Sequence, residues 1–141
     1  MATTTASISI SSNIMNYPTN INKTMTMKKL ASCHGLEETS GLNSKKFNAA
    51  TAVTVIDNTE GTAAKANKVY MRNTGSDKSQ YFYVALHTST AAAATAEAIG
   101  KLYGGDWMLM PWEATAAVSH DITVVPSTAD TMTLEWMIFQ E

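Results

Sequence analysis

Short apolar segments separated by turn-forming residues run through most of this chain, and that pattern constrains its fold more than any other feature. The segments are rich in branched and aromatic side chains, and clusters of Gly, Asn, Asp, Ser or Pro follow them. Such segments are typical of β-strands, and many in close succession are typical of antiparallel sandwiches and barrels. Strands do not alternate with long helices, which argues against an α/β nucleotide-binding fold. We therefore predict an all-β protein, either an antiparallel β-sandwich or a jelly-roll-like barrel.

The last segment is the clearest strand, because its side chains alternate with the period of two that a half-buried strand requires. One face of it is predicted to carry Met132, Leu134, Trp136 and Ile138. The other strands are predicted at residues 53–56, 68–72, 81–86, 99–103, 106–110 and 122–125. Pro111 is expected to end the strand before it, because proline has no N–H to donate to a sheet.

The segments between these strands suggest how they connect. We expect 68–72 and 81–86 to form a hairpin with a long loop, because turn residues separate them. Gly104 and Gly105 are expected to turn a second hairpin. The Thr- and Ala-rich stretch 88–98 could form a short helix over residues 91–99, because Ala is the best helix former. We expect a loop or a single turn instead, since the stretch has little apolar surface to bury and Thr lowers helix propensity.

The first third of the chain has a different character. Residues 6–10 and 24–27 alternate like strands, and the stretch between them contains Asn and Pro in a pattern typical of loops. Residues 31–45 show no clear period. We predict that residues 1–45 form an extended N-terminal arm with one or two short strands, followed by a β-sandwich domain over residues 46–141.

Composition narrows the class of function. Only 16% of residues are Asp, Glu, Lys or Arg, against about 25% in typical soluble proteins. A surface with few charges can be covered by a partner at little desolvation cost. The net charge of −2 and the single Arg72 argue against nucleic-acid binding. We find no signal peptide and no apolar stretch of membrane-spanning length, so we expect a cytosolic product with no membrane contact.

Candidate catalytic and metal-binding residues are few and scattered. Cys33 and His34 are adjacent, so on an extended chain they point to opposite faces and cannot act as nucleophile and base. His120 and Asp121, with or without His87, lack a nucleophile in a recognisable context. A single Cys rules out an intrachain disulfide, and no zinc-like spacing is present. We therefore expect no catalytic residues, no cofactor and no metal site.

Aromatic residues cluster around the two glycines. Most of these rings are expected in the core, but Trp and Tyr are also frequent anchors of protein interfaces. Trp112, which follows a proline and precedes a glutamate, is predicted to be the exposed one. Sugar binding by stacked aromatics stays open as an alternative. Together with the alternating residues of the arm, the candidate interface residues are Tyr103, Trp107, Trp112, Ile8, Ile10, Met25 and Met27.

Four stretches of the sequence carry a family resemblance. They are KANKVYMRNTG at 65–75, YFYV at 81–84, IGKLYGGDWMLMPW at 99–112 and MTLEWMIFQE at 132–141. This combination resembles small structural proteins of tailed phages, most closely those of contractile-tailed phages that infect cyanobacteria. The resemblance implies a β-sandwich-like virion protein made in the bacterial cytoplasm, a homotrimer or other ring without enzymatic activity. It carries no catalytic residue over to this chain.

Three functions follow as expectations. The first is a capsid decoration (cement) protein, which binds the major capsid protein across subunit seams and stabilises the shell. The second is a neck, tail or fibre-attachment component that contacts another virion protein. The third, from a different class, is a carbohydrate- or receptor-binding β module. The first two differ in copy number per particle, and the third requires an exposed aromatic groove.

Overall fold

The chain forms two compact units in a computed structural model, which describes residues 3–12, 19–28, 38–61, 67–86, 91–114 and 120–140. One unit spans Met1–Glu38 together with Glu141, and the other spans Thr39–Gln140. Strands make up 63% of the structure and helices 6%. The predicted all-β fold is therefore confirmed, in the form of an antiparallel sandwich.

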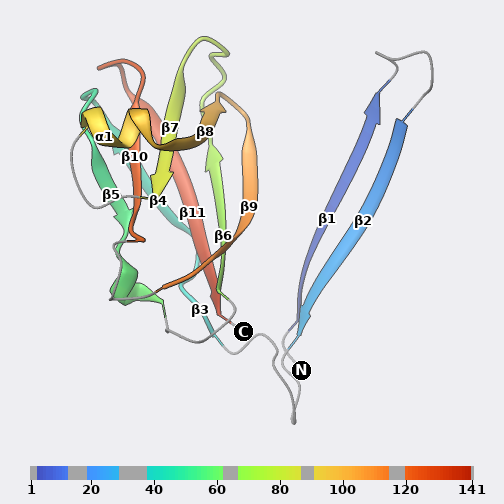
Figure 1. Ribbon diagram of the computed structural model, residues 1–141. Helices are drawn as coiled ribbons and strands as arrows, with labels where there is room; N and C mark the ends of the chain where they lie inside the picture. The colour runs from blue at the N-terminus through green and yellow to red at the C-terminus, as the bar shows by residue number, and fades with distance from the viewer. Residues whose placement is uncertain are drawn as a thin grey trace. The chain divides into compact units, whose positions relative to one another are not determined.

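The larger unit is a sandwich of two antiparallel sheets (Figure 1). The four-stranded sheet has the order β5 (Val53–Ile56), β10 (Ile122–Pro126), β7 (Tyr81–Leu86), β8 (Ala98–Tyr103). The five-stranded sheet has the order β3 (Glu38–Thr39), β11 (Met132–Gln140), β6 (Asn67–Asn73), β9 (Trp107–Trp112), and β4 (Asn43–Phe47) also pairs with β11. Each strand predicted after residue 46 is present, and β9 continues through Pro111, which an edge strand tolerates.

The core lies between the two sheets and is built by alternation on each strand. Phe82 and Val84 of β7 and Val69 and Met71 of β6 are almost fully buried. On β11 the predicted face is confirmed, because Met132, Leu134 and Ile138 are buried and Trp136 packs against the core. The ring of Phe82 meets that of Phe47 edge to face, with centroids 5.2 Å apart. Two amphipathic sheets thus bury their apolar faces against each other.

One short helix covers part of the outer face of the four-stranded sheet. Helix α1 (Ala91–Ala96) contacts β7 and β10, and Ala94 is buried together with Ala85 and Val125. This cover explains why β10 is buried on both faces. A loop or single turn was the expectation for this stretch. Ala94 packs closely on the sheet because its side chain is small, whereas Ile99, the large side chain nearby, stays exposed.

The predicted pairing of consecutive strands is wrong in two places. Residues 68–72 and 81–86 do not form a hairpin, because β6 belongs to the five-stranded sheet and β7 to the four-stranded one. Likewise β8 pairs with β7 and β9 pairs with β6, so Gly104 and Gly105 turn the chain from one sheet to the other. In both places the chain crosses the sandwich rather than folding back within one sheet.

The smaller unit contains a hairpin of two long strands, β1 (Thr3–Ser12) and β2 (Thr19–Lys28). The strands pair antiparallel in an unbroken register from Thr3 with Lys28 to Ser12 with Thr19. The predicted strands in this region are therefore present, and they are longer than expected. The predicted arm reached residue 45, whereas β3 and β4 belong to the sandwich and the contacts divide the chain after Glu38.

Candidate interaction surfaces

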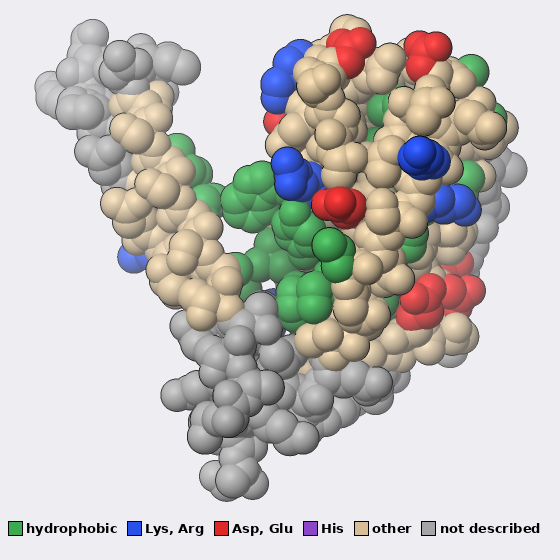
Figure 2. Space-filling model, turned by 180° about the vertical axis from the view of Figure 1, so that it is seen from behind, with side chains coloured by type: hydrophobic (Ala, Val, Ile, Leu, Met, Phe, Trp, Pro, Cys, Tyr) green, Lys and Arg blue, Asp and Glu red, His purple; other side chains and the backbone are tan. Residues whose placement is uncertain are grey.

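An apolar groove lies on the sandwich where β8 and β9 diverge into different sheets. Its cavity volume is about 590 Å³. The lining residues are Val84, Ile99, Gly100, Lys101, Leu102, Gly105, Asp106, Trp107, Met108 and Met110. We call this feature the edge groove. Figure 2 shows hydrophobic side chains gathered at this side of the sandwich.

The edge groove exists because both strands that border it are at the end of a sheet. β8 ends the four-stranded sheet and β9 ends the five-stranded sheet. The core side chains Met108 and Met110 are therefore only half-buried, and Ile99 and Trp107 are 51% and 48% exposed. Large apolar side chains at sheet ends of this kind mark a surface for another chain to cover.

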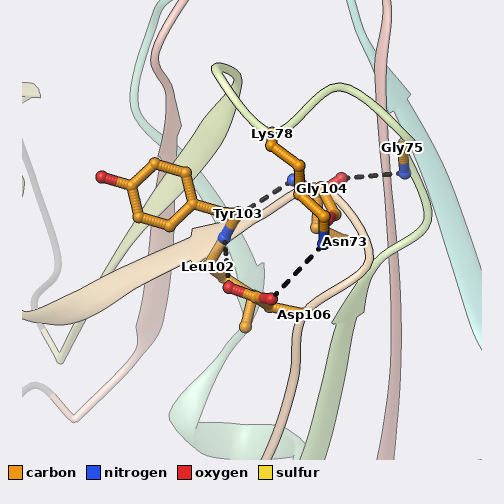
Figure 3. A network of polar contacts seen from close by, with 7 residues as sticks. All are labelled: Asn73, Gly75, Lys78, Leu102, Tyr103, Gly104 and Asp106. Carbon is orange, nitrogen blue, oxygen red and sulfur yellow. Dashed lines mark hydrogen bonds and ion pairs between the residues drawn. The ribbon is translucent and has the colours of Figure 1, made fainter. Parts of the chain in front are cut away.

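A buried asparagine fixes the corner at which the groove ends. Asn73 donates from Nδ2 to the carbonyl of Leu102 at 3.1 Å and accepts at Oδ1 from the backbone of Gly75 at 3.0 Å. Its backbone N–H donates to the Asp106 carbonyl and its carbonyl accepts from Gly105, at 3.0 and 2.9 Å. Figure 3 shows these contacts converging on one turn. One residue of β6 therefore holds the end of β8 and the start of β9 together.

The same corner excludes any side chain larger than glycine at its tightest point. A Cβ added at Gly104 would lie 2.4 Å from the carbonyl oxygen of Asp77. Lys78 donates from Nζ to the Gly104 carbonyl and lies 3.9 Å from Asp106 Oδ1, while Asp106 Oδ2 accepts from the Tyr103 backbone at 3.1 Å. The loop from Gly75 to Gln80 is thus clamped on the β8–β9 turn, which gives the groove a rigid end.

A second aromatic group lies on the outer face of the four-stranded sheet. The rings of Tyr81 and Tyr83 meet edge to face at 5.1 Å, and Tyr81 and Tyr103 meet at 5.0 Å. The Nζ of Lys101 lies 4.5 Å and 5.2 Å from the centres of the Tyr81 and Tyr83 rings. A hydrogen bond with Tyr81 raises the pKa of Lys101, and the bond between the two hydroxyls raises the pKa of Tyr81 and lowers that of Tyr83. These four residues are the tyrosine patch.

The predicted aromatic cluster is therefore divided between different parts of the sandwich. Trp107 lines the edge groove, and Tyr103 belongs to the tyrosine patch. The prediction that Trp112 is exposed is wrong, because it is only 4% exposed and its indole N–H donates to the His120 carbonyl at 2.7 Å. Its ring packs on Gly61, where an added Cβ would collide with it. Trp112 is a core residue, and Trp107 is the exposed tryptophan.

The β1–β2 hairpin has one apolar and one polar face. Ile8, Ile10 and Met25, all predicted as interface residues, are exposed and are joined by Ile21, which pairs with Ile10. Met27 lies in β2, but its side chain is outside the described part. We call Ala6, Ile8, Ile10, Ile21 and Met25 the apolar hairpin face. Lys23, the register partner of Ile8, lies on the same face between Ile21 and Met25. The opposite face carries hydroxyls and amides, with Ser7 Oγ 3.0 Å from Thr24 Oγ1.

Sequence reasoning missed several members of these surfaces. Ile21 has the same parity as Met25, so the alternation already indicated it. Met108 and Met110 were assigned to a strand, but only the pairing of β8 and β9 with different sheets places them in a groove. Tyr81 and Tyr83 carry no signal for their contact with Lys101 until the register of β7 with β8 is known.

The candidate catalytic residues are not brought together where the structure describes them. Cys33, His34 and His87 lie outside the described residues. His120 offers its carbonyl to Trp112, and the Asp121 carboxylate accepts the backbone N–H of Asn58 at 2.9 Å. Asp121 therefore anchors a loop instead of orienting a histidine.

Metal-binding and membrane-spanning features were searched over the same described ranges. They contain no group of three or more His, Cys, Asp or Glu that could hold a metal. No helix in them is long and apolar enough to cross a membrane. The two apolar surfaces and the tyrosine patch are thus the candidate functional features of the described residues.

No protein-family model matches this chain, and no curated protein or solved structure is significantly similar to it.

Proposed function

We propose that this chain is a non-enzymatic structural protein of a tailed-phage virion, and more specifically a capsid decoration protein that binds across capsid subunit seams. The observation that carries the proposal is the presence of two exposed apolar surfaces, the edge groove and the apolar hairpin face, in one small chain. Monomeric soluble proteins seldom leave contiguous apolar patches uncovered. A chain with one such surface on each unit suits an assembly of many copies.

The sparse charge of the chain supports the same conclusion. Around the edge groove, Lys101 and Asp106 are the only charged lining residues. The charged residues of the hairpin strands are Lys23 and Lys28, and their other polar residues carry hydroxyls and amides. Such surfaces lose little hydration free energy when a partner covers them, because few full charges have to be desolvated. Many weak contacts of this type, repeated over a shell, add up to strong binding through multivalency.

The resemblance to phage structural proteins supports the virion assignment, and its stretches map onto a connected part of the sandwich. Residues 65–75 include β6, residues 99–112 include β8 and β9, and residues 132–141 include β11. Residues 99–112, together with Val84 of the stretch 81–84, supply all the lining residues of the edge groove, whereas β6 and β11 lie beside β9 in the five-stranded sheet and line none of it. Two of the four stretches therefore coincide with the groove.

A neck, tail or fibre-attachment role uses the same surfaces and differs in copy number. The carbohydrate-binding alternative requires stacked aromatics in an exposed groove, and the edge groove has one aromatic lining residue, the exposed Trp107. Its predicted exposed ring, Trp112, is buried. The rings of the tyrosine patch stand at steep angles, 83° for Tyr81 with Tyr83 and 55° for Tyr81 with Tyr103, and Lys101 lies over two of them. They do not form a flat platform on which a sugar ring could stack.

The test is the number of copies of this chain per purified phage particle, measured by quantitative mass spectrometry against the major capsid protein. A decoration role requires a copy number comparable to that of the capsid subunits. A copy number typical of a single ring would support a role in the neck, tail or fibres instead of capsid decoration. Absence from the particles would overturn the virion proposal, and a glycan array would then test the remaining alternative.

A further inference from the structure

Strand β8 has one edge that no other strand covers within the described ranges. It ends the four-stranded sheet, so β7 pairs with it on the other edge alone, in a regular register from Gly100 to Tyr103. At Tyr103 the open edge is already occupied (Figure 3), because its N–H donates to the Asp106 carboxylate and its carbonyl accepts from the Asp106 N–H. Two residues earlier, the N–H and carbonyl of Lys101 point to the same edge, since backbone groups alternate in direction along a strand. An added strand can therefore pair with β8 at Lys101 and has to end beside Asp106.

The inner face beside this edge has room for side chains. Gly100 pairs with Val84, whose side chain is in the core, so a side chain at Gly100 would also point inward. An added Cβ at Gly100 meets nothing within 4 Å. The neighbouring lining residues of the edge groove are apolar, among them Leu102, Met108 and Met110. Side chains of an added strand that point into the groove therefore have to be apolar.

The outer face beside the same edge carries a cation that has no acidic neighbour in the described part of the chain. The Nζ of Lys101 lies over the rings of Tyr81 and Tyr83. Every group that raises the pKa of Lys101 is a tyrosine, with the hydrogen bond to Tyr81 first. The acidic lining residue of the groove, Asp106, lies 3.9 Å from the Nζ of Lys78 instead. An acidic side chain on the outer face of an added strand would therefore compensate the charge of Lys101.

Charge also excludes the strands of this chain that could otherwise fill the position. The open backbone groups of β8 are at Lys101, so two antiparallel copies of β8 would bring their Lys101 side chains together on one face, where like charges repel. Strands β1 and β2 contain no acidic residue to place beside Lys101. The adjacent edge, that of β9, is a poorer site for pairing because Pro111 has no N–H to donate. The occupant is thus expected from another protein, and its site is the edge of β8.

We propose that β8 binds an extended segment of another protein, which adds to the four-stranded sheet with apolar side chains in the edge groove and acidic side chains at the alternate positions, beside Lys101. In recognition of this kind, main-chain hydrogen bonds contribute affinity, and pockets for alternate side chains contribute specificity. Lys101 then has two effects, because it attracts an acidic strand and repels a second copy of β8. The proposal does not depend on the virion assignment, since the purified chain is sufficient to test it.

The first experiment measures the binding of a short labelled peptide of alternating leucine and glutamate to the full chain by fluorescence anisotropy. Two control peptides are used: one has lysine in place of glutamate, and the other has the same composition with the leucines and glutamates in separate blocks. We expect the alternating leucine–glutamate peptide to bind at least tenfold more tightly than either control. No binding of this peptide, or equal binding of all three, would overturn the proposal.

The second experiment changes the two faces of β8. Lys101→Glu should reverse the preference, so that the lysine peptide binds more tightly than the glutamate peptide, whereas a misfolded variant would lose both. Lys45→Glu is the matched control, because Lys45 also lies over an aromatic ring, that of Phe47, but on β4 of the other sheet. Gly100→Leu should fill the groove and weaken the glutamate peptide at least tenfold, and urea unfolding shows that it is folded. An equal change of preference in Lys45→Glu, or unchanged binding by Gly100→Leu, would contradict the proposed site.

The third experiment distinguishes an added strand from contact between side chains alone. The glutamate peptide is methylated at the backbone nitrogens of either its leucines or its glutamates. Alternate N–H groups of a strand point to opposite edges, so one set should abolish binding and the other should leave it. Equal effects of the two sets would rule out strand addition. Analytical ultracentrifugation tests the remaining occupant: an oligomer of the purified chain that Gly100→Leu dissociates would show that a second copy covers this edge, and the proposal would be wrong.

Discussion

The sandwich and the hairpin have the same alternation of apolar and polar residues, but their apolar faces are buried to different extents. In the sandwich, apolar faces of two sheets meet, and residues such as Phe82, Val69 and Leu134 are almost completely removed from water. In the hairpin the alternation is equally regular, yet Ile8 and Ile10 stay about two-fifths exposed, at 42% and 43%. Alternation defines which face of a strand is apolar, and the number of layers decides whether that face is buried.

The edge groove is the place where the sandwich itself resembles the hairpin. The central strands β6, β7, β10 and β11 have a neighbour on each side, but β8 and β9 end their sheets, and Ile99 and Trp107 on them remain open to solvent. The molecule therefore has a closed core and two surfaces that leave apolar side chains exposed. We expect the sandwich core to determine the stability of the chain, and the two surfaces to determine what the chain binds.

The largest effect expected from this comparison is on a core aromatic residue. Phe82→Ala removes a fully buried ring that packs on Phe47, and it should lower the free energy of unfolding by about 3–5 kcal/mol. Ile8→Ala in the hairpin, at a side chain that is 42% exposed, should change it by less than about 0.5 kcal/mol. Urea unfolding followed by tryptophan fluorescence measures this, because Trp107, Trp112 and Trp136 all lie in the sandwich. Equal losses for the two variants would contradict the comparison.

The next effect concerns the corner that closes the edge groove. Gly104→Ala puts a methyl group against the Asp77 carbonyl, so the β8–β9 turn has to shift, at a cost of about 1–3 kcal/mol. Gly100→Ala is the matched control, because an added Cβ there meets nothing within 4 Å. We expect this control to unfold at the same urea concentration as the original chain or at a higher one, since alanine restricts the unfolded state. A loss at Gly100 equal to that at Gly104 would show that the close approach is not the cause.

The positions of most strands in the sandwich can be predicted from the local sequence pattern, whereas the pairing of the strands cannot. The strands at 53–56, 81–86 and 132–139 are present as the alternation predicts. Which strands pair is decided by contacts between residues far apart in the sequence, so no local signal showed that the chain crosses between sheets at Gly104. The groove depends on that crossing and could not be derived from the sequence.

The exposure of the tryptophans could have been predicted better. A strand that ends at Pro111 places Trp112 in an exposed loop. Because an edge strand accepts proline, β9 continues, and Trp112 then has the same parity as the inward-facing Met108 and Met110. By the same parity Trp107 faces outward. The parity of these residues can be read from the sequence, but it predicts their burial only once β9 is known to be an edge strand that continues through Pro111.

An effect of the same size is expected from the polar side of the same corner. Asn73→Ala removes the N–H donor to the Leu102 carbonyl and the acceptor for the Gly75 amide, both in a buried place. Leaving buried polar groups unpaired should cost about 1–3 kcal/mol. Asn48→Ala, at an exposed loop position, should stay within about 0.5 kcal/mol of the original chain. The urea midpoints of the two variants measure the difference, and coincident midpoints would exclude a structural role for the Asn73 side chain.

The smallest effect on the free energy of unfolding is expected from replacing an exposed carboxylate, that of Asp57. Asp57 precedes the 3₁₀ turn at Asn58–Glu60 and accepts from the backbone N–H and the hydroxyl of Thr59 at 2.8 and 2.7 Å. These bonds, the backbone one first, hold the pKa of Asp57 below its ordinary value of 3.8. A carboxyl group whose pKa is lower in the folded state stabilises the protein above the unfolded pKa, and this contribution is lost as the pH falls through the folded one.

The excess stability of the original chain over Asp57→Asn should therefore be present at neutral pH and shrink as the pH falls below 3.8. Carbon NMR of the Asp57 carboxyl group gives its pKa directly. Thr59→Ala removes only the hydroxyl donor, so most of the depression should remain, because the backbone N–H is the larger cause. If the stability difference between the original chain and Asp57→Asn does not change with pH, the negative charge of Asp57 does not contribute to stability. A pKa that returns fully to 3.8 in Thr59→Ala would assign the depression to the hydroxyl and not to the backbone of the turn.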